Sequence, residues 1–481
     1  MRHLYFLLTF AFLHNYSCFS QEGVLNFKVN QESKQIKKRT YSFSNAVNND
    51  LAILVRERKN SFAFLFDENF QVKSKFDFVY KKKSKYNVVL GETILGSQYS
   101  LLYSNSIKNR FCVFTVDFDS KSIILKELKI DFQNDRYLKT ISHKNILYVL
   151  STSKKDDEII IRKLNADYEF EIIKSHTLKL EKNQKLYTQD FLSIGFWATI
   201  EPNVVKIDNR IPNAIEQVSK ENKIYVQNDN LYLTFDNSTE FTVVYSIDLV
   251  NFSIEKKKYN YPKGKIDEFK KFNSYFFDNK LFQIASSNKE MIFEVKSLEN
   301  EVLKSYYFNK ETPIDIKNSP IIQDGNTALP FVTKREFEEA SKFLRKISSG
   351  NLGVSVYKKD DAYHFTIGGV KDVSYSTGAP MIMSGPTPIT INNQVHYMPS
   401  PNPVFSSYQS YAGTKSTYFN TKLDLDFNYL KGEVDDNVFE KIKNYSESLK
   451  HMSGEDVFFH KDQLLFSYFD MKNAEFNLVK F

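Results

Sequence analysis

Apolar and polar residues alternate along most of the chain, in short runs that end at Asn, Asp, Lys or Gly. Such alternation is typical of β-strands. A longer pattern recurs seven times: an apolar run such as NDLAILV (49–55) is followed by a second apolar run that ends at a turn, often on Asp or Asn. Leu51 precedes Asp67 by 16 residues, and most other copies keep a spacing of 16 to 18 residues. The apolar runs that open the copies are 49–55, 98–104, 145–151, 229–235, 279–285, 361–367 and 462–468.

Each copy forms the middle of a larger unit. A short apolar strand such as NVVL (87–90) precedes it, and a further strand such as SIILKELKI (122–130) usually follows. Where nothing is inserted, adjacent units start about 46 to 50 residues apart. Four antiparallel strands at this period are what a β-propeller blade requires. The chain therefore resembles a seven-bladed β-propeller in architecture. It lacks the WD dipeptide, the paired kelch glycines and the tryptophan-bearing Asp-box, so the resemblance names no family.

The two ends of the chain predict how the ring closes. The chain ends at Phe481, within the third strand of the seventh unit, so that blade lacks its outermost strand. The strand VLNFKV (24–29) lies near the N-terminus and has no unit of its own. A strand that filled this gap would close the ring without an exposed edge. We therefore expect Val24–Val29 to pair beside Glu475–Phe481.

Four segments exceed the basic blade: 181–221, 311–349, 371–415 and 435–453. The first, second and fourth join the outer strand of one blade to the inner strand of the next, and the third joins the second and third strands of blade six. Strands alternate in direction, so both kinds of connection emerge on one face, which we call the decorated face. The opposite, plain face receives short turns such as Asp278-Asn279. Long loops on a rigid scaffold commonly carry function, so we expect the function on the decorated face.

Two of the insertions contain helix signals. In 331–347, Thr333 and Glu336 have the spacing of a capping box and precede an apolar stripe. In 437–450, apolar residues recur at helical spacing. We expect both stripes to pack on the propeller rather than to bind partners. The insertion 371–415 holds six prolines and is interpreted as an irregular loop that covers the central opening or forms a binding surface.

The first twenty residues predict export. A positive start precedes the apolar run 4–13, and Cys18 and Ser20 supply the small residues that a signal peptidase requires. We expect a signal peptide cleaved after Ser20, and hence a periplasmic, cell-surface or extracellular protein. The alternative is a lipid anchor at Cys18, which the upstream residues Asn15 and Tyr16 disfavour. No later stretch reaches the ~20 apolar residues of a membrane helix.

Composition limits the function classes. The 481 residues include 43 Phe and 29 Tyr, and 65 Lys+Arg against 58 Asp+Glu give a net charge of +7. This apolar content supports a large core, and so small a charge over such a length argues against a nucleic-acid partner. Cleavage would leave Cys112 as the only cysteine, which excludes a disulfide scaffold and a cysteine-based zinc module. No HExxH, GxSxG, P-loop or GxGxxG motif occurs, and we expect no cofactor or metal.

The titratable residues form no recognisable catalytic motif. We interpret His143, His176 and His460 as surface residues. Asp424 and Asp426 suggest calcium, but the repeat aligns Asp424 with aspartates of other units at the same turn, where bonding to the backbone explains them. The aligned aspartates are Asp67, Asp117 and Asp248.

Charged residues are frequent in the insertions. Paired carboxylates among them would suit glycoside hydrolysis, whereas isolated ones are ordinary solvated loop charges. We favour the second interpretation. These residues are Glu201, Asp208, Arg210, Arg335, Glu338, Asp372, Asp435 and Asp436.

The sequence as a whole predicts an exported binding or assembly module that recognises a protein or glycan partner through the decorated face. One alternative is a carbohydrate-active or other hydrolytic enzyme with its site at the mouth of the central channel, and another is a structural domain without small ligands. The absence of a catalytic motif favours binding, and the oligomeric state stays open. The candidate ligand-binding residues are Trp197, His364, Asp372, His396, Tyr397 and Asp435.

Overall fold

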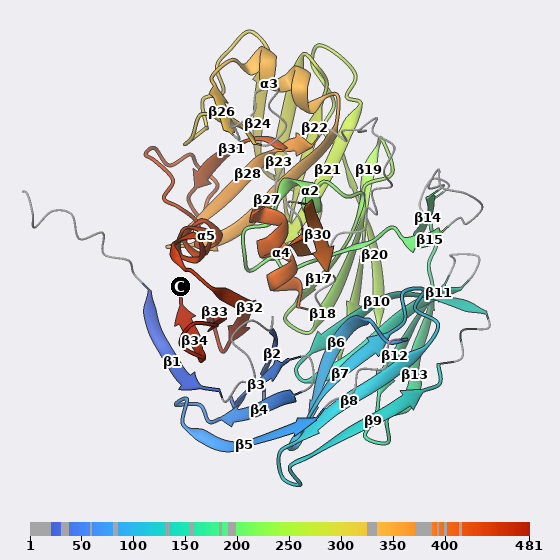
Figure 1. The fold of residues 1–481 in the computed structure, drawn as a ribbon. Coiled ribbons are helices and arrows are strands. Elements are labelled where there is room, and N and C mark those ends of the chain that lie inside the picture. Colours follow the sequence, from blue (N-terminus) through green and yellow to red (C-terminus); the bar gives the residue numbers. More distant parts are fainter. Residues whose placement is uncertain are drawn as a thin grey trace, which may run out of the picture.

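The computed structural model forms seven sheets of four or five strands around a common centre (Figure 1). The chain is therefore an all-β, seven-bladed β-propeller, as the repeat predicts. Blades are numbered one to seven in the order in which their inner strands follow one another along the chain, from β2 in blade one to β32 in blade seven. The residues that the structure describes are 21–29, 38–57, 60–79, 85–130, 132, 134–153, 158–181, 185–190, 199–324, 334–370, 387–391, 394–398, 402–412 and 416–481.

Blades one, two, three and five follow the simple pattern of four antiparallel strands in chain order from the centre to the rim. Their strands are β2 (Arg39–Ser44), β3 (Leu51–Arg56), β4 (Asn60–Phe66) and β5 (Val72–Val79); β6 (Val88–Leu95), β7 (Gln98–Ser104), β8 (Phe111–Asp117) and β9 (Ser122–Leu128); β10 (Asp135–His143), β11 (Ile146–Ser153), β12 (Glu158–Leu164) and β13 (Phe170–Thr177); and β21 (Lys271–Phe277), β22 (Lys280–Ser286), β23 (Glu290–Lys296) and β24 (Val302–Asn309).

The burial of each strand follows from its place in the blade. Neighbouring blades cover both faces of the second strand, so β3 is buried continuously from Leu51 to Val55. The outer strand β5 alternates between exposed and half-buried residues, because its blade edge faces water. Buried clusters between adjacent blades, such as the one that joins blades one and two, form the core. This explains why the second strands have the most continuous apolar runs in the sequence.

The N-terminal strand closes the ring as predicted. Blade seven contains β32 (Met452–His460), β33 (Gln463–Asp470), β34 (Glu475–Lys480) and β1 (Glu22–Lys28), in that order from the centre. Strand β1 runs antiparallel to β34, with Glu22 opposite Lys480 and Lys28 opposite Glu475. The ring of Phe27 lies 4.3 Å from that of Phe64 in blade one, so the closing strand also contacts the next blade.

Blade six takes its outer strands from an insertion that precedes it. Its sheet is ordered β26-β25-β31-β28-β27. Its strands are β25 (Ile321–Asp324), β26 (Lys334–Phe337), β27 (Asn351–Lys359), β28 (Ala362–Val370) and β31 (Ser416–Leu423). Part of the insertion 311–349 therefore completes a sheet instead of projecting from a face.

The helix in that insertion starts later than predicted. Thr333 lies outside the described residues, and Glu336 belongs to β26, which pairs along the edge of β25. Helix α3 (Ala340–Ile347) begins after Glu339, whose side chain forms no cap. The capping box is thus wrong, because strand pairing takes the residues that would have formed it. The apolar face of α3 is buried on the propeller, as predicted.

Blade four carries an additional innermost strand. Strand β16 (Val205–Ile207) pairs in parallel with β17 (Asn222–Gln227) on the side of the ring centre. The blade continues outward through β18 (Asn230–Phe235), β19 (Phe241–Asp248) and β20 (Ile254–Asn260). The same insertion holds the hairpin of β14 (Tyr187–Asp190) and β15 (Thr199–Pro202), and the one-turn helix α2 (Ile215–Val218).

The other two insertions contain further elements. The segment 371–415 includes the hairpin of β29 (Thr387–Ile391) and β30 (Gln394–Met398) and the helix α4 (Pro403–Ala412). The irregular-loop interpretation is wrong for these residues. Asn402 accepts a hydrogen bond from the Val404 amide at 3.0 Å, so an Asn before a Pro was an available helix-start signal.

Helix α5 (Val438–Ser448) confirms the helix predicted in 437–450. Asn437 and Glu440 form a capping box at its start. The described residues contain no helix that is long and apolar enough to cross a membrane.

Candidate functional site

Three helices from different insertions pack together at the decorated end of the ring. Figure 1 shows α4 near the centre, with α5 on one side of it and α2 on the other. Ser407 of α4 donates a hydrogen bond to Asn213, next to α2, at 3.1 Å. Asn437, at the start of α5, donates to the Tyr411 hydroxyl of α4 at 2.5 Å. We call α2, α4 and α5 the cap helices; they join insertions of blades four, six and seven into one packed layer.

Part of the insertion 181–221 enters the central channel. Residues 203–214, which we call the plug, run along the inside of blade four from the decorated end. The Asn209 amide reaches the plain end of the channel, where it donates to the Phe276 carbonyl at 3.2 Å. Asn213 donates from its backbone to Ser355 at 3.0 Å and from its side chain to the Tyr275 hydroxyl at 3.2 Å. The insertion is therefore not confined to one face, because these bonds hold it inside the ring.

The plug presents alternating charges to the opposite wall of the channel. Lys206 belongs to β16, and Asp208 and Arg210 follow it at every second residue in the turn after that strand. Arg210 binds Asp208 through two nitrogens at 2.9 and 2.6 Å, and its guanidinium lies 4.0 Å from the centre of the Phe459 ring. The Arg210 side chain is 57 % exposed, so water reaches the plug tip.

Two carboxylates on the channel wall complete this group, which we call the channel cluster. Glu92 comes from β6 of blade two and Asp456 from β32 of blade seven. Burial raises the pKa of Glu92 to about 8; the Asp456 charge adds to this shift, and the Lys206 charge opposes it. Burial also raises the pKa of Asp456 to about 6, although Ser42 and Asn402 stabilise its charged form. Burial lowers the pKa of Lys206. Although burial opposes it, the pKa of Asp208 stays below its usual value because Arg210 lies beside it.

The channel cluster was only partly visible in the sequence. Asp208 and Arg210 are among the insertion charges that we interpreted as solvated, whereas the structure pairs them inside the channel. The signal for the plug was the VVKIDNRI run (204–211), where charges alternate with apolar residues in a segment assigned to a loop. Glu92 and Asp456 were missed. The sequence around an acidic residue on an inner strand does not tell whether its side chain faces the channel or a solvent-exposed edge.

Of the predicted ligand-binding residues, the structure describes the side chains of His364 and Asp435 only, and these two lie at opposite ends of the ring. His364 lies two residues after the start of β28, near the plain end, with its ring 5.1 Å from that of Tyr357. Burial lowers its pKa. Asp435 is exposed and lies just before α5. Trp197 and Asp372 lie outside the described residues, as do the side chains of His396 and Tyr397 in β30.

The interpretation of His460 as a surface residue is wrong. Its exposed fraction is 1 %, and its Nδ1 lies 2.9 Å from the Ser44 hydroxyl of blade one. Burial lowers its pKa to about 4, so the ring is neutral near neutral pH. His143 is half-buried and lies 2.9 Å from Asp229. Both histidines therefore join neighbouring blades near the plain-face turns.

The repeated aspartates serve the turns, as predicted. Asp67 accepts hydrogen bonds from the backbone amides of Asn69 at 2.9 Å and Gln71 at 2.8 Å. Equivalent bonds are made by Asp117, Asp248 and Asp424. Within the described residues no group of His, Cys, Asp and Glu has the geometry of a metal site.

The same turns carry an aromatic residue that the sequence reading missed. In DENF (67–70), NADY (165–168) and DLDF (424–427), the fourth residue has a positive φ of 60°, 59° and 62°. Each aromatic side chain reaches the preceding blade: Phe70 lies 5.6 Å from His460, Tyr168 donates to Gln98 at 3.1 Å, and Phe427 lies 6.1 Å from Phe282. The pattern Asp/Asn-x-x-Phe/Tyr is therefore an inter-blade contact of this repeat.

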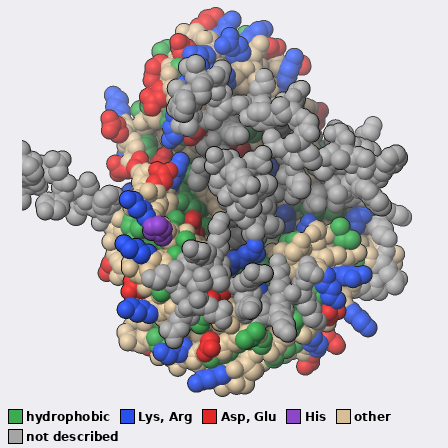
Figure 2. All heavy atoms as spheres, viewed as in Figure 1, with side chains coloured by type: hydrophobic (Ala, Val, Ile, Leu, Met, Phe, Trp, Pro, Cys, Tyr) green, Lys and Arg blue, Asp and Glu red, His purple; other side chains and the backbone are tan. Residues whose placement is uncertain are grey.

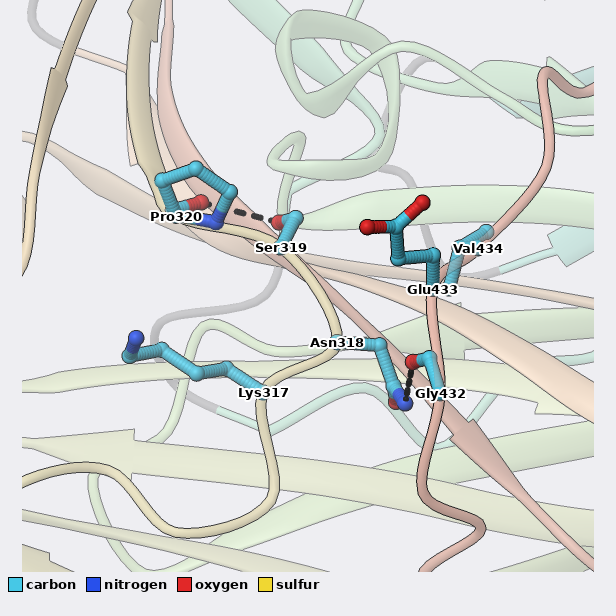
Figure 3. A pocket seen from close by; sticks show the side chains of 7 residues that line it. All are labelled: Lys317, Asn318, Ser319, Pro320, Gly432, Glu433 and Val434. Atoms are coloured by element: carbon cyan, nitrogen blue, oxygen red, sulfur yellow. Dashed lines mark hydrogen bonds between the residues drawn. The ribbon is translucent and has the colours of Figure 1, made fainter.

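A shallow hollow of about 390 Å³ lies at the edge of blade six (Figure 3). Its seven lining residues come from the loop before β25 and the loop after β31. The Asn318 amide at its base donates to the carbonyls of Leu430 at 2.7 Å and Gly432 at 2.6 Å. Because these bonds occupy its most central polar group, the hollow is better explained as the junction of two loops than as a ligand site.

Charges of both signs surround the decorated side. Figure 2 shows Lys and Arg side chains interspersed with Asp and Glu around the rim of the view. This mixture matches the small net charge of the sequence.

Several solved structures resemble the chain at low sequence identity. No protein-family model matches it, and no curated protein sequence matches it. Among solved structures, it is similar to the Dos1 propeller at 10% identity and a TM-score of 0.32, over 96% of this chain and 95% of that one. It is similar to a member of the DUF4221 family from Bacteroides vulgatus at 9% identity and a TM-score of 0.29, over 83% and 94% of the two chains. It is also similar to an apocarotenoid oxygenase chimera at 6% identity and a TM-score of 0.27. That match covers 57% of this chain and 62% of the chimera. The description of the fold rests on the seven sheets and not on these likenesses.

Proposed function

We propose that the protein is an exported binding or assembly module that recognises a protein or glycan partner through the decorated face. The observation that carries this proposal is the layer of cap helices. Insertions of three blades build it, and hydrogen bonds between α4, α5 and the plug hold it in one arrangement. A surface fixed in this way loses little conformational freedom when it binds a partner.

The two faces differ in the material they offer for recognition. The plain face consists of short turns, such as Asp278-Asn279, whose backbone φ angles of 50° and 54° fit a tight hairpin connection. The decorated side offers exposed polar positions on α5, including Asn444 and Glu447. Export follows from the expected signal peptide, which lies outside the described residues.

The test shields one face at a time. Cys112 is buried, so a cysteine introduced on the surface of the mature protein takes a 5-kDa polyethylene glycol chain selectively. Asn444→Cys and Glu447→Cys shield the decorated face; Val47→Cys and Leu425→Cys, at exposed plain-face turns, are the matched controls. Binding to a glycan array and to envelope proteins of the source cells should fall at least tenfold for the first pair only. Equal binding by all four conjugates would refute the proposal.

A second candidate is hydrolysis at the mouth of the central channel. The raised pKa of Glu92 is the observation that favours it, since a general acid must hold its proton near neutral pH. Glu92→Gln should then abolish turnover of chromogenic glycosides, while Glu268→Gln, an exposed control, should not. Turnover that survives Glu92→Gln would exclude this role for Glu92.

A further inference from the structure

The decorated ends of blades one and two carry mostly positive charge. Because strands alternate in direction, this end receives the starts of β2, β4, β6 and β8, the ends of β3, β5, β7 and β9, and the turn 105–110. Among the described residues there, six basic side chains are exposed or half-buried. We call them the basic rim: Arg39, Arg56, Lys85, Lys108, Arg110 and Lys129.

The acidic residues near these strand ends do not balance the basic rim. The side chain of Glu57 is 1 % exposed, and its carboxylate lies 3.1 Å from the Lys38 ammonium. Glu127 is half exposed and forms an ion pair with Lys85 at 2.8 Å. Asp77 lies two residues before the end of β5. Within the described residues this part of the decorated face therefore keeps a positive excess, which attracts anionic partners.

Two apolar side chains are exposed among these charges. Ile107 is 71 % exposed, and Val79, the last residue of β5, is 65 % exposed. Ile107 lies in the turn 105–110, directly before Lys108 and three residues before Arg110. Single exposed apolar residues are common on protein surfaces. What distinguishes these two is their place among basic residues, because peripheral proteins bind anionic bilayers with this combination of side chains.

The turn that carries Ile107 is held in one conformation. The Asn105 side chain accepts a hydrogen bond from the Arg110 amide at 3.1 Å. The Ser106 hydroxyl accepts one from the Asn87 side chain, in the connection before β6, at 3.0 Å. These bonds satisfy the polar groups of the turn internally, so Ile107 stays at the surface and presents its side chain to water.

Contacts between the two blades hold the basic rim together. Arg56 of β3 donates to the Tyr103 hydroxyl of β7 at 2.7 Å, and its guanidinium lies 5.8 Å from the centre of the Phe114 ring of blade two. Figure 1 shows the strands of these blades at the lower side of the ring, with α4 and α5 above them. The basic rim is therefore one surface, beside the cap helices and separate from them.

We propose that the basic rim, with Ile107 and Val79, docks the protein on an anionic lipid bilayer. Negative headgroups would bind the basic side chains, and the two apolar side chains would enter the boundary between headgroups and acyl chains. An anionic polysaccharide would use the charges but leave both apolar side chains in water, so a bilayer fits more of this surface. The proposal does not rest on the proposed function, because the cap helices belong to insertions of blades four, six and seven.

The test is co-sedimentation of the mature protein with lipid vesicles. Vesicles of phosphatidylcholine alone are compared with vesicles that contain about one third phosphatidylglycerol. We expect at least tenfold tighter binding to the anionic vesicles, and loss of this preference at about 1 M salt, where the charges are screened. No binding to the anionic vesicles at low salt, or equal binding to both kinds, overturns the proposal.

Charge-reversal variants assign the surface. Arg110→Glu combined with Lys129→Glu should weaken binding to the anionic vesicles at least tenfold. Lys121→Glu combined with Lys472→Glu is the matched control, because both lysines are exposed in plain-face turns and the net charge changes by the same amount. An equal loss for both pairs would mean that only the total charge matters, and would overturn the proposal.

A fluorescent label separates a bilayer from an anionic polymer. Cys112 is buried, so Ile107→Cys takes a nitrobenzoxadiazole label selectively, and its emission should shift to shorter wavelength on anionic vesicles. Val250→Cys is the control, because Val250 is 72 % exposed in a plain-face turn. A shift at Val250 alone overturns the proposal. So does no shift at Ile107 while charge reversal still weakens binding, which would point to an anionic polymer, with dextran sulfate as its probe. If the charge-reversal variant fails to fold, the two labelled proteins decide the question.

Discussion

The buried carboxylate of Asp236 links blade four to blade five through several hydrogen bonds. It lies at the end of β18 with a side chain that is 0 % exposed. It accepts five hydrogen bonds: from Lys223 at 2.8 Å, Thr242 at 2.9 Å, Tyr261 at 2.7 Å, and the Ser274 amide and hydroxyl at 2.9 and 2.8 Å. Ser274 belongs to blade five and the other donors to blade four and its outgoing connection, so this network fixes one blade on the next.

Removing this carboxylate should be severely destabilising. Asp236→Ala leaves the Lys223 ammonium, also 0 % exposed, without a counter-charge and leaves the other donors unsatisfied. Breaking such a pair costs about 3–5 kcal/mol. The assay is guanidinium unfolding followed by tyrosine fluorescence. The control is Glu255→Ala, whose exposed ion pair with Lys257 should contribute less than about 1 kcal/mol.

A double variant separates the charge from the packing. Because Lys223→Met with Asp236→Leu buries no charge, it should recover at least half of the loss of the single variant. A loss below about 1 kcal/mol for Asp236→Ala would refute the buried-network reasoning. A double variant as unstable as Asp236→Ala would show that packing, and not the uncompensated charge, dominates.

Three further predictions concern the turn aromatics and the two titrations. Phe427→Ala should lower the free energy of unfolding by about 3–5 kcal/mol, because the ring is 3 % exposed. Phe427→Gly should be at least as stable as Phe427→Ala, because only glycine adopts a φ of 62° without strain. Guanidinium unfolding midpoints test this order, and a clearly higher midpoint for the Ala variant than for the Gly variant would contradict it. The pKa of Glu92 is raised on folding, so the native state holds its proton and stability falls as pH rises from about 4.5 to about 8. Glu92→Gln should therefore stabilise the protein by about 1–3 kcal/mol at pH 9 and have little effect at pH 4. Guanidinium unfolding at both pH values tests this, and a variant less stable than the wild type at pH 9 would contradict it. The pKa of His460 is lowered to about 4, so stability is lost as pH falls from 6.5 to 4. Between pH 6.5 and pH 4, the His460→Gln variant should lose about 3 kcal/mol less unfolding free energy than the wild type. If both proteins lose the same amount, another group causes the acid sensitivity.

The sequence was sufficient for the ring and its closure. The 16-residue spacing from Leu51 to Asp67 reflects two antiparallel strands of fixed length. Because the strands keep this length from blade to blade, the spacing recurs in the sequence. Blade seven likewise lacked an outer strand in the sequence pattern, and the strand 24–29 had no unit of its own. Strand β1 occupies that place.

The interior of the ring was less predictable for a physical reason. Periodicity tells which side of a strand is buried, but not what covers it. The plug, the cap helices and the outer strands of blade six all depend on contacts between residues far apart in sequence, such as Ser407 with Asn213. Glu336 illustrates the competition: a local capping signal was overridden by strand pairing with Ile322.

The central claim is that partners are recognised on the decorated face, and site-specific photo-crosslinking tests it most directly. A photoreactive phenylalanine would replace Asp435 or Asn444 beside and on α5, and Val47 or Leu425 at exposed plain-face turns as controls. In the cells that make the protein, the account predicts a discrete crosslinked product from the first pair and none from the second. Crosslinks that form from Val47 or Leu425 alone would contradict it and place recognition on the plain face.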